Sequence, residues 1–214
     1  VSLADYEFAD LIDQQDKVRL LIDPTSSYAQ AAAYAMGRAM DDVIISAATG
    51  QAFTGETGSG TENAQTAIAA NVGSTTGLNI PKLAKAKETF DKADVDPSIP
   101  RHLIVSPEQI NNLLNVTEVT SSDFNTVKAL VQGDIDTFLG FKFTVSNRLA
   151  KAGNDRTCIA FAQDGITLGI GKDVNARIDE RADKSYATQV YYCMSIGATR
   201  MEQSKVIGIT CTEA

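Results

Sequence analysis

Apolar residues recur every three to four positions over residues 24–48, and this spacing predicts one long amphipathic helix. Asp23 and Pro24 suit its start, because an aspartate can cap free amide groups and proline fits the first helical position. Gly50 is a suitable stop. At the standard rise such a helix is about 36 Å long. The predicted buried stripe consists of Tyr28, Ala32, Ala35, Met36, Ala39, Met40, Val43 and Ala47.

The C-terminal part of the chain alternates apolar and polar residues, which is typical of β-strands. Along the longest predicted strand, Val190, Tyr192, Met194, Ile196 and Ala198 share one face. The predicted strands are Thr157–Ala162, Ile166–Ile170, Ala176–Glu180, Thr188–Thr199 and Val206–Cys211.

The middle of the chain mixes both periods. Helices are predicted at Pro81–Ala93, Pro107–Leu114 and Asp123–Val131, and strands at His102–Val105 and Thr137–Val145, the latter interrupted by Gly140. Ser106 is the expected N-cap of the second helix. The apolar face of the first helix is predicted to consist of Leu83, Ala84, Ala86, Lys87 and Phe90.

Two segments are less regular. Residues 1–22 fit either short strands or a short helix. Residues 50–79 are rich in glycine, threonine, serine and asparagine, and a loop of this length is uncommon inside a compact domain. We expect a functional or flexible excursion that is partly a hairpin. Helices and strands together indicate an α+β fold.

Composition narrows the function classes. The net charge is -8 and the pI about 4.7, so tight binding of nucleic acid is disfavoured. No apolar run reaches the roughly 18 residues needed to cross a bilayer, so we expect no membrane partner. Three cysteines without metal-ligand spacing, Cys158, Cys193 and Cys211, predict buried thiols in a reducing compartment.

Catalytic motifs are weak. His102 is the single histidine, so any Ser–His or Cys–His device must use it, and no G-x-S-x-G surrounds a serine. The glycine-rich stretch Thr54–Thr61 has no lysine. Gly165–Lys172 ends in Gly-Lys, but Asp173 follows where a hydroxyl should bind magnesium. We therefore predict no catalytic and no cofactor-binding residue.

The acidic residues also lack a site pattern. Asp41 and Asp42 form an acidic edge of the long helix. A second group alternates in sign and can pair internally or set the register of subunit contacts. It contains Lys172, Asp173, Arg177, Asp179, Glu180, Arg181, Asp183 and Lys184. One histidine and three scattered cysteines cannot form a recognisable zinc site, so no metal ligand is predicted.

The order of these elements resembles the major capsid protein of tailed bacteriophages, of the Hong Kong 97 type. Arg101–Leu114 reads as a buried strand that stops at Ser106 and turns into a helix. Phe138–Ser146 contains a Leu-Gly-Phe strand, and strands follow to Cys211. Tyr34–Asp42 is similar to part of the family's spine helix.

The resemblance implies three regions. Residues 1–80 would hold the end of an extended loop, the spine helix of a peripheral domain and the glycine-rich excursion. Residues 81–155 would form the axial domain, and residues 156–214 would return to the peripheral domain with its long strands. In the family the axial tips meet at ring axes, which points to residues 115–133 and to the acids Asp123 and Asp134.

The resemblance also implies a function. The chain would be a structural, non-enzymatic major capsid protein that self-assembles through pentamers and hexamers into an icosahedral shell enclosing DNA. It would reside in the virion, be assembled in the bacterial host cytoplasm, and meet scaffolding, portal or decoration proteins. The family's N-terminal arm and most of its extended loop would precede Val1, so we expect an upstream segment, and no cross-linking residue is carried over. The alternatives are an encapsulin-type nanocompartment, a small hydrolase using His102, and a monomeric binding module using residues 50–79.

Overall fold

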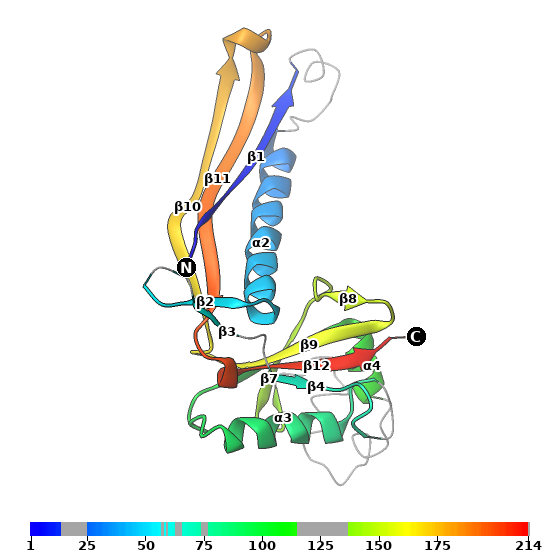
Figure 1. The fold of residues 1–214 in the computed structure, drawn as a ribbon. Coiled ribbons are helices and arrows are strands. Elements are labelled where there is room, and N and C mark those ends of the chain that lie inside the picture. The colour runs from blue at the N-terminus through cyan, green and yellow to red at the C-terminus, as the bar shows by residue number, and fades with distance from the viewer. Residues whose placement is uncertain are drawn as a thin grey trace. The chain divides into compact units, whose positions relative to one another are not determined.

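The structure is a computed structural model that describes residues 1–13, 25–56, 58, 60–62, 66–73, 77–114 and 137–213. The chain folds into two compact units, each built from two separate stretches (Figure 1). The first unit comprises Val1–Ile44 and Leu168–Ala198, and the second comprises Ile45–Thr167 and Thr199–Ala214. No described helix combines the length and the apolar content needed to cross a membrane.

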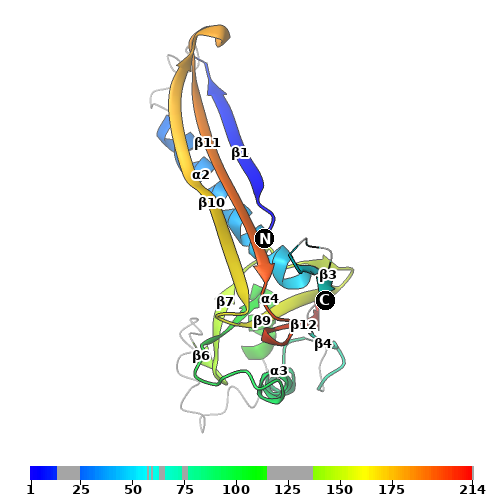
Figure 2. The ribbon, with the colours of Figure 1, turned by 60° about the vertical axis from the view of Figure 1, so that its left-hand side comes forward.

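The first unit places a helix against a three-stranded sheet. The sheet has the order β1 (Ala4–Ile12), β11 (Ala187–Arg200) and β10 (Ile166–Arg181), and the helix is α2 (Thr25–Thr49). The short 3-10 helix η1 (Ala182–Lys184) joins β10 to β11, and the two strands run in opposite directions (Figure 2). Residues 1–22 were compatible with strand or helix; 4–12 form a strand, whereas 14–22 lie outside the described residues.

The core of the first unit follows from the β1–β11 register. Tyr6 lies opposite Met194 and Ala4 opposite Ile196, so the even-numbered side chains of both strands share one face. Met36 of α2 packs against Met194 and Ile196, all at most 4% exposed.

The predicted helix is confirmed. From its stripe, Ala32 and Met36 are buried, while Ala39, Met40 and Val43 pack against the core. Ile45 and Ala48 are also buried, although the predicted stripe omitted them. Tyr28 is wrong as a core residue because it is 39% exposed, and the expected cap Asp23–Pro24 lies outside the described residues.

Strand β10 corrects the sequence prediction. Ile166–Ile170 and Ala176–Glu180 were expected to be separate strands, but one strand runs through both. The intervening residues 171–175 include Gly171, Asp173 and Asn175, which disfavour strands locally. Pairing along the fully formed strand β11 outweighs this propensity, because tertiary context commonly overrides weak β preferences.

The N-terminal residues pass close to glycines of this sheet. A Cβ built on Gly197 would collide with the carbonyl oxygen of Ser2 and lie 2.9 Å from Val1 Cγ1. Glycine is therefore required there by the close approach of backbone to backbone.

We expect Gly197→Val to destabilise the chain by about 1–3 kcal/mol, since a backbone obstacle cannot be relieved by rotating a side chain. Thermal unfolding followed by circular dichroism measures this loss. Gly37→Val provides a control for the loss of a glycine, because a Cβ at Gly37 meets nothing within 4 Å. Equal stability of wild type and Gly197→Val would contradict the prediction.

The second unit is a mixed sheet with two helices. Parallel pairs are β12–β4 and β5–β7, and the remaining described pairs of this sheet are antiparallel. The sheet order is β4 (Thr66–Ile68), β12 (Val206–Thr212), β9 (Asp155–Ala162), β5 (Arg101–Val105), β7 (Phe141–Val145) and β6 (Thr137–Phe138), with β8 (Lys151–Ala152) on β9. The 3-10 helix η2 (Gln203–Lys205) precedes β12.

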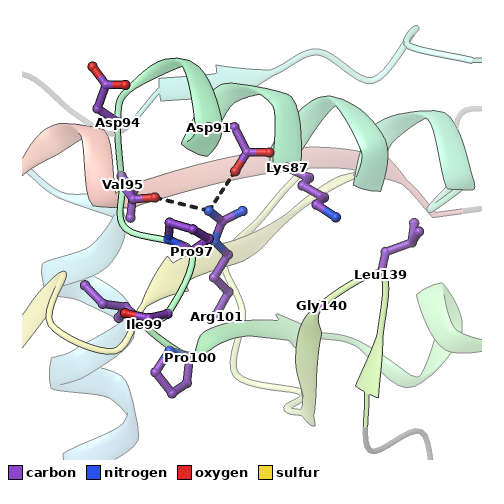
Figure 3. A pocket seen from close by; sticks show the side chains of 11 residues that line it. Lys87, Asp91, Asp94, Val95, Pro97, Ile99, Pro100, Arg101, Leu139 and Gly140 are labelled. Atoms are coloured by element: carbon purple, nitrogen blue, oxygen red, sulfur yellow. Dashed lines mark hydrogen bonds and ion pairs between the residues drawn. The ribbon is translucent and has the colours of Figure 1, made fainter.

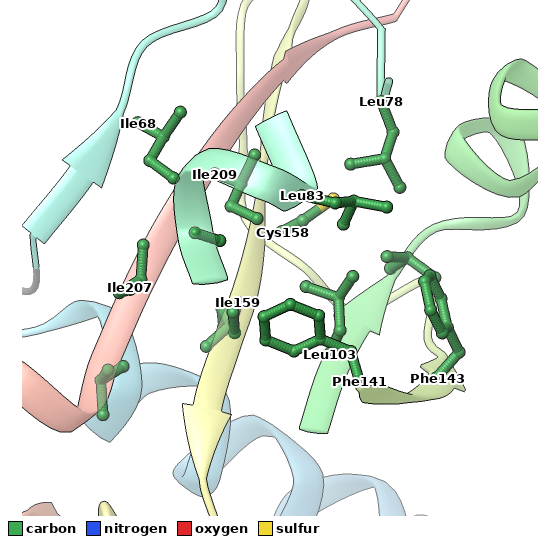
Figure 4. Close-up of a cluster of buried hydrophobic side chains, with 14 of the residues drawn as sticks. Ile68, Leu78, Leu83, Leu103, Phe141, Phe143, Cys158, Ile159, Ile207 and Ile209 are labelled. Atoms are coloured by element: carbon green, nitrogen blue, oxygen red, sulfur yellow. The ribbon is translucent and has the colours of Figure 1, made fainter. Parts of the chain in front are cut away.

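Apolar side chains from α3 (Ile80–Lys92) and from the sheet form the second core (Figure 4). Leu83, Leu103, Phe141 and Ile159 are all fully buried. The predicted apolar face of α3 needs correction, because Ala84 and Lys87 are exposed. The buried residues of α3 are Lys82, Leu83, Ala86 and Phe90.

Local signals fixed most boundaries in the second unit. The Asn79 side chain accepts a hydrogen bond from the Lys82 amide at 2.9 Å and caps α3. Ser106 precedes α4 (Pro107–Leu114), and its hydroxyl accepts from the Gln109 amide at 3.4 Å, which confirms the predicted cap. Leu139 and Gly140, both with positive φ, form the turn between β6 and β7. The predicted helix Asp123–Val131 lies outside the described residues.

Part of the glycine-rich excursion is a hairpin, as predicted. Strand β2 (Ala52–Thr54) pairs antiparallel with β3 (Gly60–Glu62). Phe53 on this hairpin is 68% exposed.

Candidate assembly surfaces

His102, the single histidine, is a half-buried side chain of the second unit's sheet. It lies on β5, where its strand neighbours are Lys142 and Phe161. Its ring stacks on Phe161 with 5.4 Å between centroids. Burial, followed by the positive charge of Lys142, lowers the pKa of His102 below its usual value. Neither strand neighbour is a serine, a cysteine or a carboxylate, so this arrangement does not support the hydrolase alternative.

The two glycine-rich stretches coincide with strands. At the ends of the first stretch, Thr54 pairs with Gly60 and Thr61 with Phe53 in the β2–β3 hairpin. Gly165–Lys172 is a turn followed by the first part of β10, and no helix follows it. A phosphate-binding loop requires a helix N-terminus behind the glycines. Neither stretch has that context.

The three cysteines are buried and free, as the sequence predicted. Cys158 and Cys211 lie on neighbouring strands β9 and β12. The hydrogen bond between their thiols raises the pKa of Cys158 and lowers that of Cys211. Among the described residues no group of histidine, cysteine, aspartate and glutamate could hold a metal ion.

A hollow of about 610 Å³ lies in the second unit beside α3 (Figure 3). Arg101 lies in its wall, is only 7% exposed, and contacts the Asp91 carboxylate at 2.7 Å and the Phe90 ring at 5.2 Å. Lys87 and Asp94 also line the hollow. The two basic and two acidic side chains of the lining balance one another in charge.

Buried polar groups anchor the C-terminal end of the second unit. The Glu213 side chain is 1% exposed and lies 2.7 Å from Arg156 Nε and 3.1 Å from Lys151 Nζ. Ser106 donates a hydrogen bond of 2.7 Å to the same carboxylate, and the Glu213 amide donates to the Asn154 carbonyl at 2.7 Å. This network ties the chain end to β8, β9 and the start of α4. The sequence analysis did not identify it.

Strand β10 of the first unit has a long exposed edge. Every residue from Ile170 to Glu180 is exposed, and in the described part of the chain no strand pairs with the outer edge of β10. Three apolar side chains on it, Ile170, Val174 and Ile178, are 54%, 37% and 49% exposed. Such an edge is a template for pairing with another chain.

The alternating charges on β10 pair internally only in part. Arg181 donates from Nε to Asp183 at 2.7 Å, and this hydrogen bond lowers the pKa of Asp183 to about 2. Lys172 Nζ lies 3.1 Å from the Cys193 sulfur. Arg177 and Asp179 make no ion pair with any residue that the structure describes. The expected ring-axis residues 115–133 and Asp134 lie outside the described residues.

The fold has clear relatives among solved structures. A structure from Mycobacterium phage Che8 shares 19% identity and a TM-score of 0.66, over 96% of this chain and 70% of that chain. The capsid of cyanophage P-SCSP1u shares 15% identity and a TM-score of 0.72, over 98% and 72%. The capsid of Ralstonia phage GP4 shares 10% identity and a TM-score of 0.71, over 99% of this chain and 74% of that chain. No curated protein sequence is significantly similar to this chain.

At these identities the structural likeness establishes the fold, which is the Hong Kong 97-type α+β fold expected from the sequence. The sequence model of the phage capsid protein family matches residues 1–213. Because this match spans nearly every residue, the chain belongs to the phage capsid protein family and has the structural role of a major capsid protein.

Proposed function

We propose that copies of this chain associate into rings of five and six, and that these rings close into an icosahedral shell around phage DNA. The observation that carries the proposal is the family match over residues 1–213. A closed shell of identical subunits needs edges that meet in a heterologous, head-to-tail manner within each ring. The net charge of -8 is compatible with enclosing DNA, because a container does not have to bind its content tightly.

The roles of the three sequence regions belong to this proposal. Residues 81–155 would supply the axial domain, while residues 1–80 and 156–214 would supply the peripheral domain. The order of strand, helix and Leu-Gly-Phe strand between Arg101 and Val145 supports the axial assignment of residues 81–155. Strands β9 and β12 are an exception to this division, because they lie in one sheet with β5, and we assign them to the axial domain rather than to the first unit. Scaffolding, portal and decoration proteins are further proposed partners. The mature protein belongs to the virion, and we propose assembly in the host cytoplasm.

Assembly is tested directly by light scattering and negative-stain electron microscopy. The samples are this chain and a version extended upstream of Val1, over a range of salt and protein concentration. Shells or rings of five and six from either version are the expected result. Folded monomers from both versions under every condition would overturn the proposal.

We also propose that the protein is not an enzyme. His102→Ala should leave shell formation unchanged, because the ring contacts Phe161 and Lys142 without serving a reaction. Particle yield by sedimentation and particle shape by microscopy are the readouts. His102→Phe is the matched variant, since it keeps a ring against Phe161. A hydrolytic activity that His102→Ala and His102→Phe both abolish would contradict the proposal.

A further inference from the structure

The outer edge of β10 has the features of a strand that awaits a partner. It is exposed over residues 170–180, and those residues contain no proline. Proteins commonly protect such an edge with proline, bulges or charged side chains. Here the charges on the edge alternate in sign, so they favour only a partner strand whose register brings opposite charges together.

The direction of the backbone groups limits how a partner strand can pair. The Val174 amide donates 2.8 Å to the side chain of Asp173 next to it. In an antiparallel sheet alternate residues direct their backbone groups to opposite neighbours. Val174 and the other even-numbered residues of β10 therefore face the free edge, and a pairing strand must bond to them.

The charges of β10 are complementary to those of a second, antiparallel copy of β10. If two copies pair antiparallel with Asn175 opposite Asn175, Asp173 of each copy lies opposite Arg177 of the other. Val174 then lies opposite Ala176, and both are even-numbered, as the backbone groups require. No like charges are directly opposite. Moving the register by two residues, to a centre at Ala176, places Asp173 opposite Asp179 twice and is disfavoured.

The apolar residues support the same register. Ile170, Val174 and Ile178 recur every four residues and so share one face of the strand. In the pairing centred at Asn175, Ile178 of one copy lies diagonally beside Val174 and Ile170 of the other. Diagonal neighbours on a sheet are within reach of such side chains. Pairing would thus cover apolar surface that each copy exposes alone.

We infer that the outer edge of β10 is an interface between two copies of this chain, which pair antiparallel about a two-fold axis at Asn175. This inference rests on the proposed self-assembly and adds to it a contact that joins subunits isologously, where the ring contacts are heterologous. On pairing, Asp173 exchanges its bond to the Val174 amide for Arg177 of the second copy. The freed amide then donates to the second copy's backbone.

A charge-swap cycle tests the register. Asp173→Arg places one arginine opposite Arg177 at each end of the contact, and Arg177→Asp places one aspartate opposite Asp173 at each end. Each single variant should weaken association of the chain about tenfold, because the two-fold symmetry makes each substitution create two repulsive pairs in the contact. The double variant Asp173→Arg/Arg177→Asp restores both pairs and should restore association. Association is measured by sedimentation velocity, and circular dichroism confirms that each variant folds.

A disulfide tests the axis itself. In the proposed register, the cysteine of Asn175→Cys lies opposite the same cysteine of the second copy. The two residues form a non-hydrogen-bonded pair, in which the Cβ atoms are about 4.5–5.5 Å apart. Mild oxidation of assembled protein should give a covalent dimer on a non-reducing gel. The native cysteines are at most 8% exposed and should not react. Ala9→Cys, exposed on the opposite edge strand β1, is the control and should give none.

The outcomes separate this inference from the proposed function. Shells that form without an Asn175→Cys dimer, and single charge variants that assemble normally, would overturn the β10 pairing and leave the shell function intact. A dimer with Asn175→Cys together with rescue by the double charge variant supports the pairing. Failure of every version to associate would overturn both.

Discussion

Glu213→Ala should lower the free energy of unfolding by about 3–5 kcal/mol, the usual cost of removing one partner from a buried ion pair. The carboxylate is surrounded by Arg156, Lys151 and Ser106, and its side chain is 1% exposed. Its removal takes the carboxylate away from the Arg156 guanidinium, which is only 17% exposed and therefore poorly compensated by water. Urea unfolding monitored by circular dichroism measures the loss.

The same network predicts a dependence on acid. Burial alone would raise the pKa of Glu213, but the hydrogen bond from Ser106 and the contacts with Arg156 and Lys151 outweigh it and lower the pKa from 4.5 to about 2. The folded state therefore releases this proton more readily than the unfolded chain. The resulting stabilisation, about 3 kcal/mol, is fully present above pH 4.5 and is lost as the pH falls toward 2.

Two variants separate charge from packing. Glu213→Gln keeps the shape but cannot ionise, so the part of the pH dependence between 4.5 and 2 that Glu213 causes should disappear. Glu202→Ala removes a 56% exposed carboxylate that is near Lys205, and it should change stability by less than about 1 kcal/mol. If Glu213→Ala were no more destabilising than Glu202→Ala, the anchoring role of the C-terminal network would be wrong.

The sequence predicted the elements whose own residues determine them. The start of α4 follows from Ser106, the predicted cap, which contacts the amide three residues further on. The start of α3 was predicted within one residue, although its cap, Asn79, was not identified. The face of β11 that carries Val190, Met194 and Ile196 follows from strict alternation, and these three side chains are at most 1% exposed. Local chemistry of this kind can be read without knowing what packs nearby.

Features that depend on contacts between residues far apart in the sequence were missed. Strand β10 runs through Gly171–Asn175 because β11 lies beside it, and nothing in those five residues indicates that neighbour. Glu213 was not identified from the sequence, because its partners Ser106 and Arg156 are far away along the chain. The alternating charges on β10 were recognised in the sequence. That they lie on a free sheet edge became visible only from the strand order of the sheet.

Lys82 was the one missed residue that left a signal. It lies four residues before Ala86 and eight before Phe90, so helical spacing places it on the buried stripe of α3. A lysine is an unlikely occupant of an apolar stripe unless its ammonium group finds buried acceptors. The spacing was visible in the sequence, whereas its acceptors, contributed by residues 77, 210 and 211, were not.

Lys82→Ala should destabilise the second unit by about 3–5 kcal/mol, because one buried and one partly buried carbonyl oxygen lose their donor and a cavity opens. Lys82 is 0% exposed, and its Nζ donates to the Gly77 carbonyl at 2.8 Å and the Thr210 carbonyl at 3.1 Å. It also lies 3.9 Å from the Cys211 sulfur. These contacts join the start of α3 to the last strand of the sheet. Urea unfolding is again the measurement.

The matched control is Lys85→Ala on the same helix, whose side chain is 49% exposed beside Glu88 and should cost less than about 1 kcal/mol. The unfolding free energy at alkaline pH distinguishes the two lysines as well. Burial lowers the pKa of Lys82 below 10.5, so the unfolding free energy should rise with pH between the lowered value and 10.5. In Lys82→Ala that rise should disappear, while Lys85→Ala should retain it. Loss of the rise in both variants would show that its source is not the buried ammonium, because the two substitutions remove the same charge and differ in its burial.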